Sequence, residues 1–331
     1  MAALRVLITG ATGFIGNRLL DPLIASGASV RCLSRDPERA RRRWPEREWV
    51  GGDVRYAGTL AAALRGCDVA YYLVHGMDDP SAGWMERERA AAETFARAAE
   101  QSQVARLVYL GGVQPAGEPS PHLRSRLETG ERLRAGRVPC AELRAAMVVG
   151  AGSASWTIVR DLAARLPAMV LPVWLEHLSQ PVAVDDVIDA LVAAARVPLP
   201  ASRVWDLPGP EELSGTQILL AIAELLGHRP WIARVPVVSP RLSSHWIRWV
   251  TRADHRLAAE LVEGLTSDLL ASQPSFWSEA GLPAPMPFEE AARRALRAEP
   301  RLPRRARLLE SLAGRLTRSP NAMPGRRPRA P

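Results

Sequence analysis

The sequence predicts an α/β protein in which a doubly wound parallel sheet carries helices on both faces and is followed by a small C-terminal subdomain. Over residues 1–150, short apolar runs alternate with amphipathic stretches, one strand and one helix about every 30 residues. Such an alternation requires right-handed crossovers, which produce a parallel sheet. A glycine-rich loop at residues 10–16 stands between the first apolar run and the first amphipathic stretch, where a helix N-terminus can bind phosphate.

The first 150 residues contain six predicted strands with helices between them. The strands are expected at residues 4–9, 28–34, 47–51, 68–74, 105–110 and 141–149. The helices are expected at residues 13–26, from residue 36 onward, and at 57–64, 83–102 and 121–135. Asp36 and Pro37 mark the start of the second helix, because an Asp side chain caps free N–H groups and Pro fits the first helical position.

The pattern loosens after residue 150. Helices are expected at residues 153–166, 185–195, 214–226, 254–270 and 288–297, with short strands at 182–184 and 204–207. Asp185 and Asp186 have a structural explanation as the N-cap before one of these helices. The expected organisation is a sheet domain (1–150), an interleaved subdomain on the substrate side (151–297), and a basic, largely disordered tail rich in Pro and Arg (298–331).

The basic charge is concentrated in this tail. All 43 basic residues are Arg, and no Lys is present. Residues 293–331 hold twelve Arg against Glu299 and Glu310, a net charge of +10; since the whole chain carries +8, residues 1–292 carry −2. A protein that binds nucleic acid is expected to spread basic charge over a folded face, so sequence-specific binding to nucleic acid is not expected.

Four leucines of the tail have the spacing that places them on one face of a short helix: Leu308, Leu309, Leu312 and Leu316. Because basic residues flank them, weak contact of the tail with a membrane surface stays open beside a solvated, disordered tail. Removal of residues 300–331 is expected to leave the fold intact.

The rest of the composition suits a cytoplasmic protein. No apolar run approaches the roughly 20 residues of a membrane helix. The glycine loop begins at residue 10, which leaves no room for a signal or transit peptide before it. The three Cys lie far apart without metal-ligand spacing, so we expect reduced thiols and no metal. The substrate and the oligomeric state are not indicated.

Each glycine of the loop has a role in binding a dinucleotide. Gly10 allows a tight turn, Gly13 lets backbone amides approach a pyrophosphate, and Gly16 lets the helix pack closely on the strand. The diphosphate then lies at the helix N-terminus, which favours negative charge. In this strand–loop–helix context the motif is typical of a Rossmann NAD(P)-binding domain. The predicted contacts are Thr9, Gly10, Thr12, Gly13, Phe14, Ile15 and Gly16.

The end of the second strand distinguishes NADP from NAD. An acidic residue there binds the ribose hydroxyls of NAD, whereas an Arg accepts the 2′-phosphate of NADP. Here the strand ends with Arg35, and the neighbouring Asp36 is expected to be engaged as a helix cap. The sequence therefore favours NADP(H), with NAD(H) still open, because Arg35 can also be an ordinary solvated charge.

Several further segments resemble one protein superfamily. The loop TGATGFIG, together with Gly52-Asp53-Val54, Tyr72-Leu-Val-His75 and Val184-Asp-Asp-Val187, resembles the short-chain dehydrogenase/reductase superfamily. The likeness covers about residues 4–297 and is best to its extended and atypical branches, which include epimerase-like and NmrA-like proteins.

The resemblance implies further cofactor contacts. Asp53 and Val54 would border the adenine, while Val74, His75 and Gly76 would border the nicotinamide ribose. His75 has an equal claim to be a packed loop residue.

The catalytic pair that the resemblance implies is absent. In most enzymes of the superfamily a Tyr donates or accepts the proton, assisted by a Lys four residues on, with a Ser or Thr nearby. These positions fall on His122 and Arg126, and the hydroxyl would fall near residues 110–112, where the chain has Leu and two Gly. The chain has four Tyr and no Lys, so the standard pair occurs nowhere in it.

His122 and Arg126 are tentative substitutes. A neighbouring guanidinium and a helix N-terminus both disfavour imidazolium, so the pKa of His122 is expected below its reference of about 6.5. A neutral imidazole can still donate a hydrogen bond to a substrate carbonyl, although it is a poor proton donor. The alternative also stays open: both residues can simply lie in the first turns of a helix and interact with solvent.

Two functions from different classes remain. The first is an NADP-dependent oxidoreductase or isomerase acting on a small substrate that is apolar or bears a carbonyl. The second is a non-catalytic NADP(H)-binding redox sensor or assembly protein, which the missing Tyr–Lys pair favours. Residues 231–251, which contain three Trp, form either core or interface or else an apolar lid over a substrate.

Overall fold

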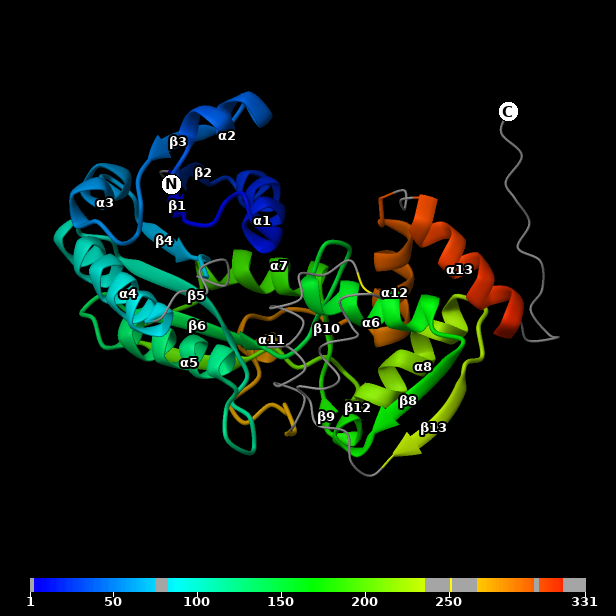
Figure 1. Ribbon diagram of the computed structural model, residues 1–331. Helices are drawn as coiled ribbons and strands as arrows, with labels where there is room; N and C mark the ends of the chain where they lie inside the picture. The colour runs from blue at the N-terminus through cyan, green and yellow to red at the C-terminus, as the bar shows by residue number, and fades with distance from the viewer. Residues whose placement is uncertain (1–2, 76–82, 236–250, 252–266, 301–303, 318–331) are drawn as a thin grey trace.

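The computed structural model describes residues 3–75, 83–235, 251, 267–300 and 304–317 (Figure 1). Seven strands form one sheet in the order β11-β6-β5-β4-β1-β2-β3, and every neighbouring pair is parallel. These strands are β1 (Arg5–Ile8), β2 (Ser29–Ser34), β3 (Glu48–Gly51), β4 (Val69–Tyr72), β5 (Arg106–Gly112), β6 (Cys140–Ala145) and β11 (Arg203–Asp206). The doubly wound α/β class predicted from the sequence is confirmed.

Helices cover both faces of the sheet, because successive strand residues point to opposite sides. Val6 and Ile8 of β1 pack into a core with α1 (Phe14–Ala25), α2 (Pro37–Arg43), α7 (Val184–Ala194) and α11 (Phe276–Glu279). Leu7 between them packs on the opposite face, against α3 (Ala57–Leu64), α4 (Trp84–Gln101) and α5 (Pro121–Arg134). Within residues 1–140, the observed elements match the expected ranges to within a few residues.

The apolar run at residues 141–149, expected as a single strand, is two strands in different sheets. After β6 ends at Ala145 the chain leaves the main sheet, and β7 (Val148–Val149) pairs with β10 (Val182–Ala183). Both pieces are largely buried, although β6 also contains Glu142 and Arg144, so burial alone does not mark the break.

The second lobe has a core of its own. It contains α6 (Ala154–Arg165), α8 (Gly215–Leu225), α12 (Phe288–Arg297) and the two-stranded pairs β7–β10, β8–β13 and β9–β12. The remaining pieces are β8 (Ala168–Pro172), η1 (Val173–Glu176), β9 (Leu178–Ser179), β12 (Leu213–Ser214) and β13 (Trp231–Val235). Because α7 and β11 return from this region to the main sheet, the two lobes are interleaved along the chain (Figure 1).

Two expectations for the second half are wrong. Asp185 and Asp186 are not an N-cap: α7 begins at Val184, and Ala183 is its cap residue. The Asp186 carboxylate instead accepts a hydrogen bond from the backbone N–H of Met286, at 2.7 Å, and so ties α7 to the segment before α12. Residues 267–270 are not helical, and the rest of the helix expected at 254–270 lies outside the described residues.

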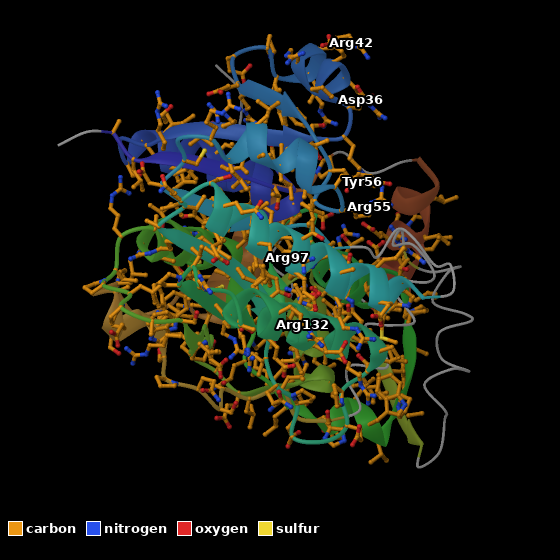
Figure 2. All side chains as sticks on the ribbon, turned by 90° about the vertical axis from the view of Figure 1, so that its left-hand side faces the viewer. Asp36, Arg42, Arg55, Tyr56, Arg97 and Arg132 are labelled. Atoms are coloured by element: carbon orange, nitrogen blue, oxygen red, sulfur yellow. The ribbon has the colours of Figure 1, made fainter. Side chains whose placement is uncertain are left out.

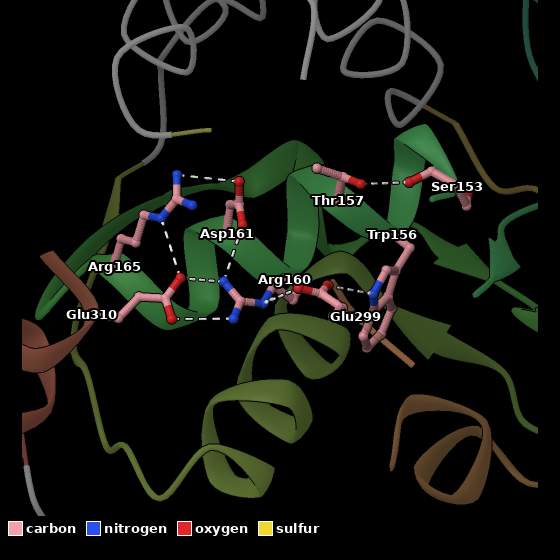
Figure 3. Close-up of polar contacts among 8 residues, drawn as sticks. All are labelled: Ser153, Trp156, Thr157, Arg160, Asp161, Arg165, Glu299 and Glu310. Atoms are coloured by element: carbon pink, nitrogen blue, oxygen red, sulfur yellow. Dashed lines mark hydrogen bonds and ion pairs between the residues drawn. The ribbon is translucent and has the colours of Figure 1, made fainter. Parts of the chain in front are cut away.

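The tail contains an ordered, anchored helix, α13 (Arg304–Thr317), which differs from the expectation of a largely disordered segment. Its Glu310 forms ion pairs with Arg160 and Arg165 of α6 (Figure 3). The tail also supplies Glu299, which pairs with Arg160 and accepts a hydrogen bond from Trp156. Residues 318–331 lie outside the described part of the chain. Among the described helices, none is long and apolar enough to cross a bilayer.

Candidate cofactor and substrate site

A cavity of about 480 Å³ lies at the carboxyl edge of the main sheet, between the two lobes. The glycine loop after β1 closes one end of it, the ends of β4 and β5 and the start of α5 form one wall, and α6 and α8 form the other. The chain winds to opposite sides of the sheet at β1, which lies between β4 and β2. Ligands of open α/β sheets bind in the crevice at such a switch point.

The backbone of the loop permits only glycine at two positions. Gly10 has a φ of +68°, and a Cβ there would lie 2.4 Å from the carbonyl oxygen of Leu73. A Cβ on Gly16 would lie 2.3 Å from the carbonyl oxygen of Gly10. These geometries agree with the tight turn and the close helix packing expected for Gly10 and Gly16.

The N-terminus of α1 is open to the cavity. Gly13 is its N-cap residue, and no side chain caps the first turn. The N–H groups of Phe14, Ile15 and Gly16 have no partner within the helix, and all three residues line the cavity. These N–H donors and the helix dipole are thus arranged to bind a phosphate group. The glycine loop around them fits the diphosphate of a dinucleotide.

Thr9 and Thr12 were predicted to contact the cofactor directly, but their side chains lie elsewhere than on the cavity wall. The Thr9 hydroxyl is buried, donates to the carbonyl oxygen of Tyr71 at 2.9 Å and accepts from the N–H of Leu73 at 3.0 Å. It therefore joins β1 to β4 and shapes the loop, because its hydrogen bonds are already made. Thr12 is exposed at the tip of the loop and is not among the residues that line the cavity.

Charged residues gather where β2 and β3 end, at the position expected for the adenosine. Asp36 caps α2 by accepting a hydrogen bond from the N–H of Arg39 at 2.9 Å, which confirms the predicted cap. Its carboxylate is thus engaged, while Arg35 is exposed beside it. Figure 2 shows Asp36 and Arg55 along the same edge of the protein.

Asp53 lies near Arg35 and is paired with Arg55. The Arg55 guanidinium donates to the Asp53 carboxylate at 2.6 Å. This hydrogen bond, with a smaller contribution from Arg35, holds the pKa of Asp53 below its usual value. The region therefore presents positive charge with its carboxylates already paired, which suits a 2′-phosphate better than a pair of ribose hydroxyls.

Of the other cofactor contacts that the resemblance implied, two pack against the core and one lines the cavity. Val54 and Val74 are partly buried and pack against the core formed with α3 and α4. His75, at the end of β4, lines the cavity. Gly76 lies outside the described residues.

His122 and Arg126, the positions that the resemblance implied for the catalytic pair, lie together on the cavity wall. Both are on the face of α5 that is turned to β5, and both line the cavity. Arg126 donates to the carbonyl oxygen of Leu110 at 2.9 Å through Nη2, while its buried Nε–H has no partner among the described groups. A Cβ on Gly112 would lie 2.9 Å from Cδ2 of Leu123, so the glycine lets α5 pack closely on β5.

The two cavity histidines are held neutral. Burial, together with the smaller effect of the Arg126 guanidinium, lowers the pKa of His122 to about 3. Burial, followed by Arg126 and His122, also keeps the pKa of His75 well below its usual value. The direction predicted for His122 is confirmed, although burial, the largest cause, was not foreseen. A neutral imidazole carries one N–H at physiological pH and so offers a hydrogen bond without a charge.

All four tyrosines lie outside the cavity lining. Tyr71 donates its hydroxyl hydrogen to the carbonyl oxygen of Leu191 at 2.7 Å, and Tyr109 donates to that of Arg126 at 2.9 Å. Tyr72 is buried in the core, and Tyr56 is 59% exposed on the surface. The absence of a Tyr–Lys pair from the sequence therefore matches a cavity wall without tyrosine.

Two serine hydroxyls in the cavity were missed in the sequence. Ser153 and Ser155 lie at the N-terminus of α6, line the cavity, and their Oγ atoms are 3.0 Å apart. The preceding Gly150 and Gly152 lie against the ring of Phe14, so the serines approach the cofactor loop from the second lobe. In the sequence, the one feature that could have indicated these serines is the glycine-rich segment 150–153 directly before a helix.

Away from the loop the cavity is apolar. Side chains of α6 and α8 and of the segment between them form this chamber: Ile158, Val159, Leu162, Leu166, Met169, Leu171, Leu175, Ile218 and Leu219. An apolar pocket with a few converging polar groups at one end is the usual form of a small-molecule site. The chamber therefore offers a mainly apolar surface next to the glycine loop.

Comparison with known proteins agrees with this geometry. The model of a family described as NAD(P)H-binding matches residues 10–164. A triphenylmethane reductase from Citrobacter sp., complexed with NADP(H), superposes with a TM-score of 0.69 at 17% identity, covering 88% of this chain and all of that one. A dTDP-glucose 4,6-dehydratase from Streptomyces venezuelae superposes with a TM-score of 0.66 at 18% identity, covering 89% of this chain and 96% of that chain.

Residues 10–164 therefore match an NAD(P)H-binding family, and the described fold is similar to that of these two enzymes. Two curated relatives are a 4-hydroxy-2-methyl-3-oxo-4-farnesyl-3,4-dihydroquinoline-1-oxide ketoreductase from Stigmatella aurantiaca and a ceramide reductase from Caulobacter vibrioides. The first is 24% identical over 73% of this chain and 79% of its own length. The second is 28% identical over 70% of this chain and 73% of its own length. This chain therefore resembles two reductases over most of its length.

Proposed function

We propose that this protein is an NADP(H)-dependent reductase of an apolar small molecule that bears a carbonyl group. The observation that carries the proposal is the cavity itself, which joins the phosphate loop, a polar wall with His122 and Arg126, and an apolar chamber. The curated relatives named as reductases act, by their names, on a farnesylated quinoline and on a ceramide, and both names support an apolar substrate.

The chain's residues have distinct parts in such a reaction. A bound reduced nicotinamide supplies a hydride to the carbonyl carbon. The N–H groups at the start of α1 hold the diphosphate, and the free Nε–H of Arg126 suits a ribose hydroxyl of the cofactor. Neutral His122 donates a hydrogen bond to the carbonyl oxygen, where negative charge develops, and water supplies the proton that completes the alcohol.

The His122 assignment predicts a loss of turnover without a loss of cofactor. His122→Ala is expected to lower kcat/KM for a ketone substrate by about 10²-fold, because one donor to the developing oxyanion is lost. His122→Gln, which keeps an N–H donor, should retain more activity, and the Kd for NADPH should stay unchanged in both. Arg124→Ala, on the same helix but exposed, is the matched control.

These rates are measured by following NADPH fluorescence with a panel of long-chain ketones and small polar ketones. Equal turnover of His122→Ala and the unmodified protein would contradict the role of His122. Tight NADPH binding without consumption by any ketone would favour the alternative, a non-catalytic NADP(H)-binding sensor or assembly protein, which the absence of Tyr and Lys from the cavity supports.

Arg35 is expected to set the preference for NADP(H). Arg35→Glu should raise the Kd for NADPH about ten- to hundredfold, since a charge-assisted contact with the 2′-phosphate is replaced by repulsion, and should leave the Kd for NADH nearly unchanged. Arg42→Glu makes the same charge change at the other end of α2 and is the control (Figure 2). Titration of both cofactors measures the effect; an equal loss for NADPH and NADH would contradict the NADP assignment.

A further inference from the structure

Helix α13 presents a row of leucines to solvent. Leu308, Leu309, Leu312 and Leu316 are 63%, 45%, 47% and 71% exposed. At 3.6 residues per turn these four positions fall within an arc of about 100° of the helix. We call them the leucine stripe. Isolated exposed leucines are ordinary on protein surfaces, but four along one face of one helix form a contiguous apolar strip.

The opposite face of α13 fixes the direction of the leucine stripe. Ala313 and Thr317 are buried, and the Thr317 carbonyl oxygen accepts a hydrogen bond from the N–H of Arg229 at 3.1 Å. Glu310 forms ion pairs with Arg160 and Arg165 of α6 (Figure 3). The helix is therefore held against the body, and the stripe cannot turn inward without breaking these contacts.

The charge around the leucine stripe is positive and is not offset by the tail itself. Helix α13 contains Arg304, Arg305, Arg307 and Arg315. The only acidic residues of positions 293–331 are Glu299 and Glu310, and both form ion pairs with Arg160. Because the body supplies a partner for both carboxylates, the basic charge that the sequence gives to this segment is not offset within it.

We propose that the leucine stripe, which belongs to a segment with a net charge of +10, docks on the surface of an anionic lipid bilayer. An exposed apolar helix face with flanking Arg is the arrangement that lies in the headgroup region, where leucines reach the acyl boundary and arginines meet lipid phosphates. Trp231, 78% exposed, follows two residues after the contact between Arg229 and Thr317, and Trp is favoured at this depth. The inference does not depend on the proposed reductase activity.

The leucine stripe favours a lipid surface, and not a polyanion such as RNA, as the binding partner. Nucleic-acid sites combine basic groups with aromatic platforms, and apolar aliphatic side chains contribute nothing to phosphate binding. Docking would also place the cavity near the bilayer, since Ile158 and Leu162 of α6 line the cavity while Arg160 and Arg165 of the same helix hold α13.

The test is sedimentation of the full-length protein with vesicles. Vesicles of phosphatidylcholine with an equal amount of phosphatidylglycerol are expected to bind at least about tenfold better than pure phosphatidylcholine vesicles. Binding should weaken in about 0.5 M NaCl, because exposed charges are then screened. Equal binding to both kinds of vesicle, or no binding to either, would overturn the proposal.

Variants separate docking through the leucine stripe from plain charge attraction. The double variant Leu312→Gln/Leu316→Gln should lower partitioning to the anionic vesicles at least about tenfold, since two apolar side chains no longer leave water. Leu316→Gln alone should weaken binding more than Ile24→Gln, which removes a 52% exposed aliphatic side chain on α1. Thermal melting checks that each variant is folded.

Evidence that the leucine stripe or the tail binds a polyanion or a second copy of the chain, instead of a bilayer, would overturn the proposal. If the Leu variants bind vesicles as well as the unmodified protein does, and bind an RNA homopolymer equally, the tail is a general polyanion binder. If sedimentation velocity shows a dimer that Leu316→Gln dissociates, the leucine stripe is covered by a second copy of the chain.

Discussion

Gly16→Ala is expected to raise the Kd for NADPH by about 10²-fold, a loss of about 2.7 kcal/mol of binding free energy. A Cβ at this position would lie 2.3 Å from the Gly10 carbonyl oxygen and 2.8 Å from its carbon, both backbone atoms that no rotamer change can move. Helix α1 must therefore shift by about 1 Å, since non-bonded contacts need more than 3 Å. The N–H groups that hold the diphosphate move with it, and hydrogen bonds weaken steeply when misaligned.

Gly58→Ala is the matched control for this prediction. Gly58 also lies within a helix, α3, and a Cβ there meets nothing within 4 Å. The Kd should be unchanged and the thermal midpoint equal or slightly higher, because Ala is about 1 kcal/mol better than Gly inside a helix. Calorimetric titration with NADPH measures both variants. Equal Kd values for the two would show that the loop does not require its close packing on α1.

Arg160→Ala is expected to lower the free energy of unfolding by about 3–5 kcal/mol. The Arg160 side chain is 6% exposed and forms ion pairs with Asp161, Glu299 and Glu310 (Figure 3). Without it Glu299, which is 9% exposed, loses this ion pair, while Asp161 and Glu310, which are 0% and 17% exposed, keep their pairs with Arg165. Breaking a buried pair costs more than the pair contributes, because uncompensated charge stays buried.

Arg293→Ala controls for the loss of a surface ion pair. Arg293 pairs with Glu289 and Glu290 on α12, where its side chain is 44% exposed, and such pairs contribute about 1 kcal/mol or less. Chemical unfolding compares the two variants, and limited proteolysis should release α13 only from Arg160→Ala. Similar small losses for both would contradict the anchoring of the tail. The expectation that residues 300–331 can be removed without consequence is also in conflict with this cluster.

The sequence predicted what depends on local pattern. The strand–glycine loop–helix unit at residues 5–25 and the cap at Asp36 rest on residues within one turn of each other, so backbone rules are enough to place them. His122 and Arg126 were chosen from the resemblance, and both line the cavity, because a spacing of four on one helix puts two side chains on the same face.

The features that were missed depend on contacts distant in sequence. Glu310 meets Arg160 across 150 positions, so the composition of the tail could not show that one of its two acids is a buried anchor. The break after Ala145 separates two buried strands that belong to different sheets. The burial that lowers the pKa of His122 depends on the tertiary fold around α5, which no local pattern reports.

The assignment as an NADPH-dependent reductase is tested most directly by following a deuterium label from the cofactor into the product. The full-length protein is incubated with NADPH deuterated at C4 on either face of the nicotinamide and with a long-chain aliphatic ketone, and the alcohol is analysed by mass spectrometry. One deuterium at the carbinol carbon from one of the two labelled cofactors, at a rate that His122→Ala lowers, is the predicted result. Tight NADPH binding with no labelled alcohol from any ketone of the panel would contradict the reductase assignment.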